Sequence, residues 1–257
     1  MSARAIETLQ SVDYILCEDT RRAHKLKAHF SLTAPLISFH EHNEQKRIPQ
    51  IVSRMQKGKT FALISDAGAP LVSDPGLGLV RELIRLEIPF TCVPGPSAVI
   101  TALLLSGFTP QPFLFYGFLP VKAAERKRTL EELHQFHGCA VILFESPERV
   151  VSLVREIGER LGDRDIAICR EMTKIHEDIL RGKPSELLPR IVSRKLIGEF
   201  TIVIAPGEAP TSEMSEESIR ARFEQLLKEG SSRKDALKKL AKESGRSRND
   251  LYALLLK

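Results

Sequence analysis

Short apolar segments alternate with longer amphipathic segments along most of the chain, and this alternation limits the possible folds more than any other feature. The short segments are rich in β-branched and aromatic residues and are bounded by glycine, proline or charge, which is typical of strands. We expect strands at residues 12–18, 36–39, 60–65, 90–94, 113–117, 139–145, 166–169 and 197–205. We expect helices at residues 3–11, 21–29, 43–57, 76–87, 96–106, 123–137, 147–161 and 184–194. The alternation predicts an α/β fold with mainly parallel sheets.

Two proline-containing segments predict where this α/β region divides. Residues 108–112 place two prolines directly after a predicted helix, and residues 205–213 form a linker of proline, glycine and glutamate. Beyond the linker only helices are expected, at residues 215–229, 233–243 and 247–256. The predicted domains are therefore two α/β domains and one small helical domain, over residues 1–109, 110–207 and 213–257.

The composition is that of an ordinary globular protein. Of the 257 residues, 42% are apolar and 28% are charged, which excludes a disordered or fibrous chain. The longest apolar run, residues 98–105, is far shorter than the roughly 20 residues that a membrane span needs. Charged residues also interrupt the N-terminal region, so we expect neither a membrane span nor a signal peptide.

The cysteines are far apart in the sequence, and each lies inside an apolar run. This spacing predicts buried free thiols in a reducing cytoplasm rather than disulfides or a metal site. His40 and His42 have no third ligand at the spacing of a zinc site, so no metal is expected. The cysteines are Cys17, Cys92, Cys139 and Cys169.

The positive charge of the chain lies at its C-terminal end. The formal net charge is +5, and residues 228–257 alone carry nine basic and four acidic residues. The rest of the chain is therefore neutral. A basic helical tail on a neutral body indicates an anionic partner, most simply a nucleic acid, although a solvated helix face explains the same charges.

Two loops have the composition of ligand-binding segments. Residues 65–76 follow a predicted strand and contain two aspartates, two prolines and two glycines, and residues 94–98 follow another strand and lead into a helix. Small residues let a ligand approach the backbone closely, and open α/β sheets bind ligands where their strands end. Within the first loop, Asp74 is expected to cap a helix that begins near Pro75.

A set of short motifs resembles one known family. The motifs match in order and spacing over essentially the whole chain, and together they are specific. They are Cys-Glu-Asp-Thr-Arg at 17–21, Ser-Phe-His-Glu-His-Asn-Glu at 38–44, the two loops at 65–76 and 94–98, Phe-Glu-Ser-Pro-Glu-Arg at 144–149, Arg-Glu-Met-Thr-Lys at 170–174 with His176 and Glu177, and Gly-Glu-Phe-Thr at 198–201. The chain resembles the 16S ribosomal RNA cytidine-2′-O-methyltransferases, within the tetrapyrrole methylase superfamily.

This resemblance implies two αβα domains of the tetrapyrrole methylase type with a small C-terminal helical appendage. It implies a homodimer that binds S-adenosylmethionine (SAM) between the two domains and methylates a cytidine ribose in the decoding region of the small ribosomal subunit. Family members typically open with a strand and a Thr-Pro-Ile-Gly-Asn-like loop ahead of the first helix. This chain begins at that helix, so we expect the first strand and loop to be absent from it.

The resemblance also implies which residues bind the cofactor. One group lines the pocket from the first domain, and a second group closes over it from the second domain. The expected cofactor-binding residues are Gly68, Ala69, Pro70, Val72, Ser97, Ala98, Phe144, Glu145, Met172 and Glu199.

Methyl transfer to a ribose hydroxyl requires that the hydroxyl lies in line with the sulfur–methyl bond, and a nearby base accelerates the step by roughly 10²–10⁴-fold. The sequence does not choose among the candidate bases, which are Asp19, Glu145, Glu171, His176 and Glu199. Arg21, Arg170 and Lys174 are expected to hold phosphates near the target ribose. The helix-turn-helix-like tail is expected to contact further phosphates through Arg233, Lys234, Lys238, Lys239, Lys242, Arg246 and Arg248.

Two alternative functions remain open from the sequence. The superfamily includes C-methyltransferases of tetrapyrrole biosynthesis, but the basic helical tail favours an RNA substrate. A non-catalytic RNA-binding or ribosome-binding relative is the other alternative, since part of the site is expected to be absent.

Overall fold

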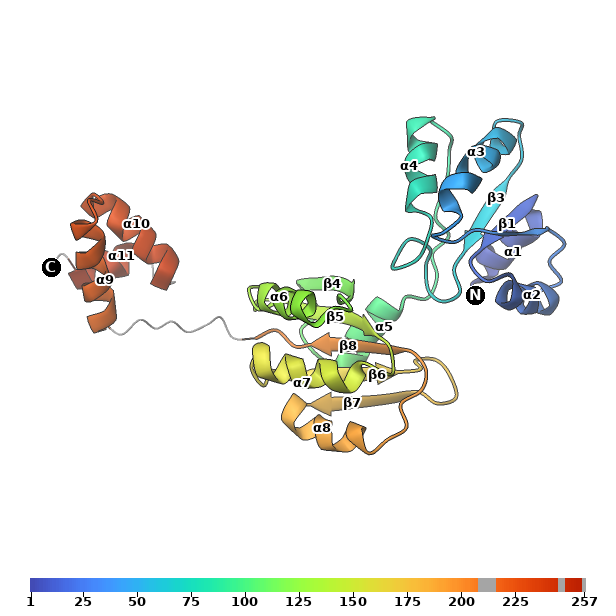
Figure 1. The fold of residues 1–257 in the computed structure, drawn as a ribbon. Helices are drawn as coiled ribbons and strands as arrows, with labels where there is room; N and C mark the ends of the chain where they lie inside the picture. Colours follow the sequence, from blue (N-terminus) through green and yellow to red (C-terminus); the bar gives the residue numbers. More distant parts are fainter. Residues whose placement is uncertain (208–215, 245–247, 256–257) are drawn as a thin grey trace. The chain divides into compact units, whose positions relative to one another are not determined.

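The computed structural model describes residues 1–207, 216–244 and 248–255. It divides the chain into two compact units, Met1–Pro206 and Gly207–Lys257. The first unit contains two β-sheets with their helices, and the described residues of the second form helices (Figure 1). None of the helices in the described ranges has the length and apolar character that crossing a membrane demands.

The first sheet has three parallel strands in the order β2-β1-β3. Alternate residues of β1 face opposite sides: Leu16 packs with α3 and α4, whereas Ile15 packs with α1 and the segment after α2. This alternation explains why the strands are short apolar runs with helices on both faces. The elements are α1 (Ala3–Ser11), β1 (Tyr14–Cys17), α2 (Thr20–His29), β2 (Leu36–Ser38), α3 (Glu44–Met55), β3 (Phe61–Ile64) and α4 (Leu77–Arg85).

The strand predicted at residues 90–94 is wrong. Within the part of the chain that the structure describes, this segment pairs with no strand, and β3 forms the edge of the first sheet. Phe90 and Cys92 are exposed, so the expectation of a buried thiol also fails at Cys92. The other three cysteines are buried, and all four are free. An apolar run favours a strand, but only a partner strand can satisfy its backbone hydrogen bonds.

The second sheet has five strands in the order β4-β5-β8-β6-β7. Only β4 and β5 pair in parallel, and the remaining pairs are antiparallel, so the expectation of mainly parallel sheets is wrong here. Strand β7 was not predicted, because its two apolar residues, Ile179 and Leu180, are flanked by charged residues. The strands are β4 (Phe113–Phe118), β5 (Ala140–Glu145), β6 (Ile166–Arg170), β7 (Asp178–Gly182) and β8 (Phe200–Ile204).

Helices cover both faces of the second sheet (Figure 1). On one face lie α6 (Ala123–Leu133), α7 (Val150–Arg160) and α8 (Pro184–Val192), and on the other lies α5 (Ala98–Ser106). The predicted domain boundary after residue 109 would separate α5 from this sheet. Its residues Val99, Ala102 and Leu103 instead belong to the core that β5, β6 and β8 form on that face.

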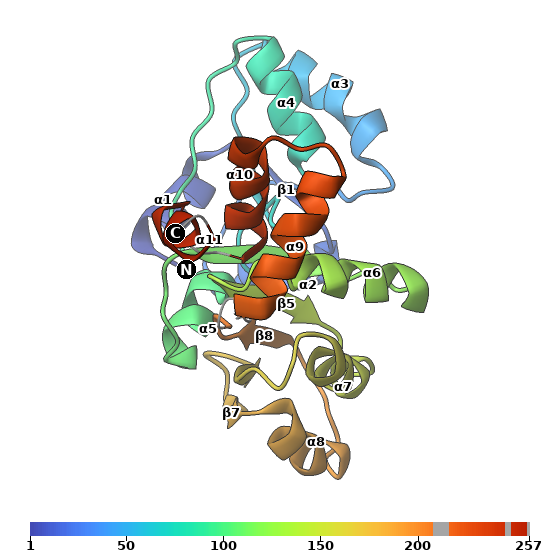
Figure 2. The same ribbon diagram turned by 90° about the vertical axis from the view of Figure 1, so that its left-hand side faces the viewer.

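The second unit contains α9 (Glu216–Lys228), α10 (Arg233–Ser244) and α11 (Arg248–Leu255). Figures 1 and 2 show α9 beside α10. Apolar residues of α10 and α11 pack together with Ile219, Phe223 and Leu226 of α9. This small core therefore orients α10 with Ala236, Leu237 and Leu240 inside, and leaves exposed those basic side chains of α10 that the structure describes.

Candidate functional site

The first candidate region lies where the strands of the first sheet end. Cys17 ends β1 and Ile64 ends β3, and the residues that follow are joined: the Asp19 amide donates to Asp66 Oδ1 at 3.3 Å. Arg22 Nη1 lies 3.4 Å from Asp66 Oδ2. The loop of residues 65–76 therefore begins at a fixed point on this edge of the sheet, as the position of a ligand loop in an α/β fold requires.

The backbone of this loop is strained. Leu71 and Ser73 have φ values of +71° and +65°, which side-chain-bearing residues rarely adopt. Gly76 has φ +126°, and a Cβ there would lie 2.6 Å from Leu63 and 2.9 Å from Leu71. Such conformations persist where the surroundings enforce them, and they are concentrated in ligand clamps and active sites.

The tip of the loop offers unused hydrogen-bond donors. Ser65 Oγ donates to the carbonyl oxygens of Ala67 and Gly68, both at 3.1 Å. Among the described residues, the amides of Ala67, Gly68 and Ala69 have no acceptor, and these three residues are exposed. Free amides beside small side chains fit the carboxylate and ribose hydroxyls of a nucleoside-type ligand such as SAM.

The second predicted loop places Ser97 at the start of α5. Its Oγ accepts from the Ile100 amide at 3.4 Å, so the hydroxyl acts as a helix cap. The helix begins at Ala98, two residues later than predicted. At Gly95 a Cβ would meet no atom within 4 Å, which leaves space beside the backbone of this turn.

Asp74 does not cap α4, contrary to the prediction. The residue before α4 is Gly76, and Glu44 of α3 caps the helix instead. Within the described residues, the Asp74 carboxylate has no hydrogen bond or ion pair. Burial raises its pKa to about 6, and the carboxylates of Glu18 and Asp66 add to the shift. Asp74 is therefore a half-buried carboxylate of raised pKa, a property that the sequence did not reveal.

The Asp19 carboxylate is paired with Arg21. Its Oδ1 accepts from the Arg21 amide at 2.8 Å, and its Oδ2 lies 2.9 Å from Arg21 Nη2. The hydrogen bonds from the guanidinium and from the amide lower the pKa of Asp19 to about 2. A carboxylate with so low a pKa is a weak base. The side chain of Arg21 is 90% exposed, so it is open to an anion.

The second candidate region contains a network of three charged side chains. Lys174 Nζ lies 2.7 Å from Glu171 Oε1 and 3.1 Å from Glu199 Oε2. Glu171 Oε1 also accepts from the Glu199 amide at 2.9 Å. These bonds, first from Lys174 and then from Glu199, lower the pKa of Glu171. The structure thus brings together three residues that were predicted separately.

The backbone around this network is also strained. Glu171 and Thr173 have φ values of +48° and +66°. Arg170 Nε donates to the carbonyl of Ile197 at 2.8 Å, which joins the end of β6 to the segment before β8. His176 is exposed and has no interaction among the described residues. The network therefore lies on a hydrogen-bonded turn of strained backbone, whereas His176 is not part of it.

Glu145 is enclosed rather than open to a substrate. Its side chain is fully buried, and Oε1 accepts from Arg149 Nη2 at 2.6 Å and from the Ser146 amide at 2.7 Å. Oε2 is buried without a partner in the described part of the chain. This pair fixes the turn from β5 into α7.

Phe144 and Met172, two predicted cofactor residues, contribute apolar surface. The ring of Phe144 packs edge to face on Phe115 and Phe118, with centroids 5.0 and 5.6 Å apart. Phe144 and Met172 pack against the core on the α5 side of the sheet. Both are therefore suited to contact an apolar part of a ligand.

The loop of the first candidate region approaches the second sheet at one point. A Cβ built on Gly117 of β4 would lie 3.0 Å from Ser73 Oγ, and Gly117 has φ +85°. The loop of residues 65–76 therefore reaches the edge strand of the second sheet.

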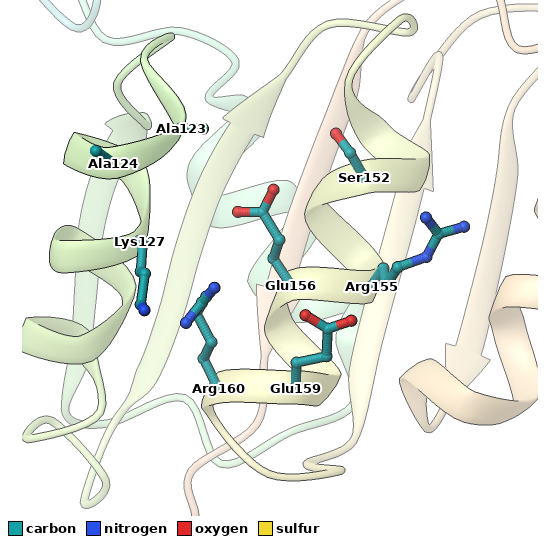
Figure 3. Close-up of a pocket in the computed structure, with 8 residues that line it drawn as sticks. All are labelled: Ala123, Ala124, Lys127, Ser152, Arg155, Glu156, Glu159 and Arg160. Atoms are coloured by element: carbon teal, nitrogen blue, oxygen red, sulfur yellow. The ribbon is translucent and has the colours of Figure 1, made fainter.

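A groove of about 440 Å³ lies elsewhere, between α6 and α7 (Figure 3). Charged side chains from both helices line it, and Arg126 pairs with its Glu156 at 2.6 Å. None of the residues predicted from the sequence lies in this groove. Its mixed charges are those of two helices joined by ion pairs.

Comparison with known proteins identifies the family. Residues 1–188 match the family of Tetrapyrrole (Corrin/Porphyrin) Methylases. A Thermotoga maritima protein is 44% identical over 208 residues, which cover 81% of this chain and 93% of that protein. A Bacillus subtilis protein is 37% identical over 257 residues, covering 98% and 88% respectively. Both relatives are named Ribosomal RNA small subunit methyltransferase I.

Solved structures show the same fold. A diphthine synthase superposes with a TM-score of 0.61 at 13% identity, over 80% of this chain and 84% of its own. A cobalt precorrin-4 methyltransferase superposes with a TM-score of 0.58 at 18% identity, over 80% and 88%. The α/β fold, the family and the expectation of a methyltransferase are confirmed. The chain belongs to the tetrapyrrole (corrin/porphyrin) methylase family, in the group of relatives named ribosomal RNA small subunit methyltransferase I.

Proposed function

We propose that this protein transfers a methyl group from SAM to the 2′-oxygen of a cytidine ribose in the decoding region of 16S ribosomal RNA. The relatives of 37–44% identity support the substrate class through their names. The observation that carries the cofactor assignment is the exposed loop tip, with three unused amides at the end of β3. The cofactor supplies a methyl group bonded to a positively charged sulfur.

Residues of both regions hold the cofactor in this proposal. The free amides of the 67–69 segment bind its polar groups, and Phe144 and Met172 supply apolar contacts. Pro70 and Val72 continue the first wall, and the turn at Ser97 and Ala98 forms the second. Glu199 acts through the Lys174 network, which fixes the segment before β8.

Asp74 is the proton acceptor for the ribose hydroxyl in this proposal. It lies in the same loop as the cofactor residues, it is half-buried, and no described cation neutralises it. Asp19 is too weak a base, because Arg21 holds its pKa at about 2. Glu145 is enclosed by its own ion pair. Arg21, Arg170 and Lys174 bind phosphates on either side of the target ribose.

The basic tail anchors the RNA. Helix α10 exposes a set of cations on the side opposite its apolar core, and this arrangement suits contact with a phosphate backbone. Arg246 lies outside the described residues, and only the backbone is described for Lys242 and Arg248. The exposed cations of α10 are Arg233, Lys234, Lys238 and Lys239.

A homodimer in the cytoplasm completes the proposal. Helix α5 is apolar on every side, and its residues Ile100 and Leu104 remain exposed although the helix packs on the second sheet. Light scattering on the purified protein is expected to give twice the monomer mass of 28.8 kDa. If the protein remains a monomer at every concentration up to about 100 micromolar, this part of the proposal is contradicted.

The test of the activity uses small ribosomal subunits that lack the modification. The protein is incubated with them and with SAM carrying a labelled methyl group, and the RNA is then digested to nucleosides. Labelled 2′-O-methylcytidine is the expected product. A base-methylated nucleoside contradicts the ribose assignment, and no incorporation favours the non-catalytic RNA-binding alternative.

A further inference from the structure

Glu44, the first residue of α3, reaches the start of another helix. Its Oε1 accepts from the amides of Gly78 and Leu79 at 2.8 and 3.2 Å. These are first-turn amides of α4, which have no acceptor inside their own helix. A negative charge at this end also interacts favourably with the helix dipole. Since Gly76, the residue before α4, has no side chain, Glu44 is the cap of this helix.

The turn that carries Glu44 is itself fixed. Asn43 Oδ1 accepts from the His40 amide at 2.9 Å, and Asn43 Nδ2 donates to the Ser38 carbonyl at 3.2 Å. The His40 carbonyl in turn accepts from the amides of Asn43 and Glu44, both at 2.9 Å. The end of β2 and the start of α3 thus form one hydrogen-bonded turn, which presents the Glu44 carboxylate in a defined position.

Gly78 provides the space for this contact. A Cβ at Gly78 would lie 2.7 Å from Glu44 Oε1. Gly78 has ordinary helical φ, so its backbone does not require glycine, and glycine is a poor helix former. The approach of the carboxylate therefore explains why this position is a glycine.

The cap controls one end of the candidate cofactor loop. Residues 65–76 leave β3 at one end and enter α4 at the other. We propose that Glu44 is a positioning residue for SAM binding, because its cap on α4 holds this loop in its binding conformation. The inference rests on the proposed function, in which the loop binds the cofactor. A loop held in place before binding loses less affinity to ordering.

Four variants and one control test this inference in the full chain: Glu44→Ala, Glu44→Gln, Gly78→Ala, the double variant Glu44→Ala with Gly78→Ala, and Glu7→Ala. Calorimetric titration measures the Kd of SAM, and hydrogen exchange measures opening at the amides of Gly78 and Leu79. Glu44→Ala is expected to raise the Kd about tenfold and to accelerate exchange at both amides. Glu44→Gln retains an acceptor oxygen and is expected to restore most of the affinity.

The double variant separates the contact from a general loss of stability. Gly78→Ala alone displaces the Glu44 carboxylate and is expected to weaken SAM binding as Glu44→Ala does. In the Glu44→Ala background the same methyl group meets no carboxylate, and its other close neighbour is the flexible end of Ile48 at 3.2 Å, so it is expected to add little further loss. Glu7, an exposed residue of α1, is the matched glutamate whose replacement leaves the Kd unchanged.

The outcomes distinguish the inference from the function on which it rests. If the unaltered chain binds no SAM, the proposed function fails and the inference falls with it. If the unaltered chain binds SAM and Glu44→Ala binds it equally well, the inference alone is overturned, whatever happens to the melting temperature. Additive losses in the double variant also overturn it, because they show that the two residues act separately.

Discussion

The Glu171 carboxylate packs directly against Gly198, so that a Cβ on Gly198 would lie 2.5 Å from the carboxyl group. Gly198 also has φ +97°, a conformation open mainly to glycine. The position of Glu171, and through it of Lys174 and Glu199, thus depends on a residue that has no side chain. A glycine at this position is therefore required for the network to form.

Gly198→Ala is expected to displace Glu171 and to lower the free energy of unfolding by about 1–3 kcal/mol, because the new residue is strained as well as crowded. The Lys174 ion pairs are lost at the same time. Chemical denaturation measures the change. Gly138→Ala is the matched control, since a Cβ there meets no atom within 4 Å. Equal stability of the two variants contradicts the described packing.

Asp74→Asn tests the proton acceptor. Below about pH 6 Asp74 is protonated, so kcat/KM of the unaltered enzyme is expected to fall about tenfold per pH unit there. The variant is expected to lose roughly 10²–10⁴-fold in kcat and to lack this acidic limb. Asp165→Asn, at an exposed aspartate, is the control. An unchanged acidic limb in Asp74→Asn excludes Asp74 as its origin.

Stability provides an independent test of the same residue. The pKa of Asp74 is higher in the folded state than in the unfolded state, so the folded state binds the proton more tightly. The contribution of Asp74 to stability is therefore complete below about pH 4 and is lost as the pH rises to about 6. Asp74→Asn removes this dependence and is expected to be no less stable than the unaltered protein at pH 7. A variant that loses both stability and activity points to a structural role.

Local sequence patterns predicted most of the fold. Each apolar run that became a buried strand, such as Val141 to Phe144 in β5, carried its own signal. Two strand errors have one cause: strand formation depends on partners as well as on residues. Residues 90–94 have the apolar composition of a strand but no partner strand among the described residues. Strand β7 contains charged residues but pairs with β6.

The sequence predicted the site only where the residues belong to one short motif, and not where they depend on contacts between distant segments. The sequence motifs indicated the two loops and the Lys174 region. The motifs did not indicate that Glu44 caps a helix through an amide 34 residues away. They also did not indicate that Asp74 therefore does not cap this helix. The pKa of Asp74 depends on burial, on Glu18 at the end of β1 and on Asp66 at the start of its own loop. Such properties arise only from tertiary packing.

Arg149→Met tests the buried ion pair. Glu145 would then keep a fully buried carboxylate with no cation beside it, so the free energy of unfolding is expected to fall by about 3–5 kcal/mol. Thermal and chemical denaturation measure the loss. Replacing Glu145 by Leu in the same chain removes the uncompensated charge and is expected to recover most of it. If the double variant is less stable than Arg149→Met, the unpaired carboxylate is not the source of the loss and the expectation is contradicted.

Neutralising the tail tests RNA anchoring. Replacement of Arg233, Lys234, Lys238 and Lys239 by glutamine is expected to weaken binding to small-subunit RNA and to flatten its salt dependence. Each lost phosphate contact reduces the slope of log K against log salt by about 0.7–0.9. The Kd of SAM is expected to stay unchanged, because these residues belong to the second unit and not to the cofactor loops. Glutamine at Lys122, Lys127, Arg128 and Lys195, exposed cations of the first unit, is the charge-matched control. An equal salt slope for the tail variant and the unaltered protein removes the anchoring role from α10.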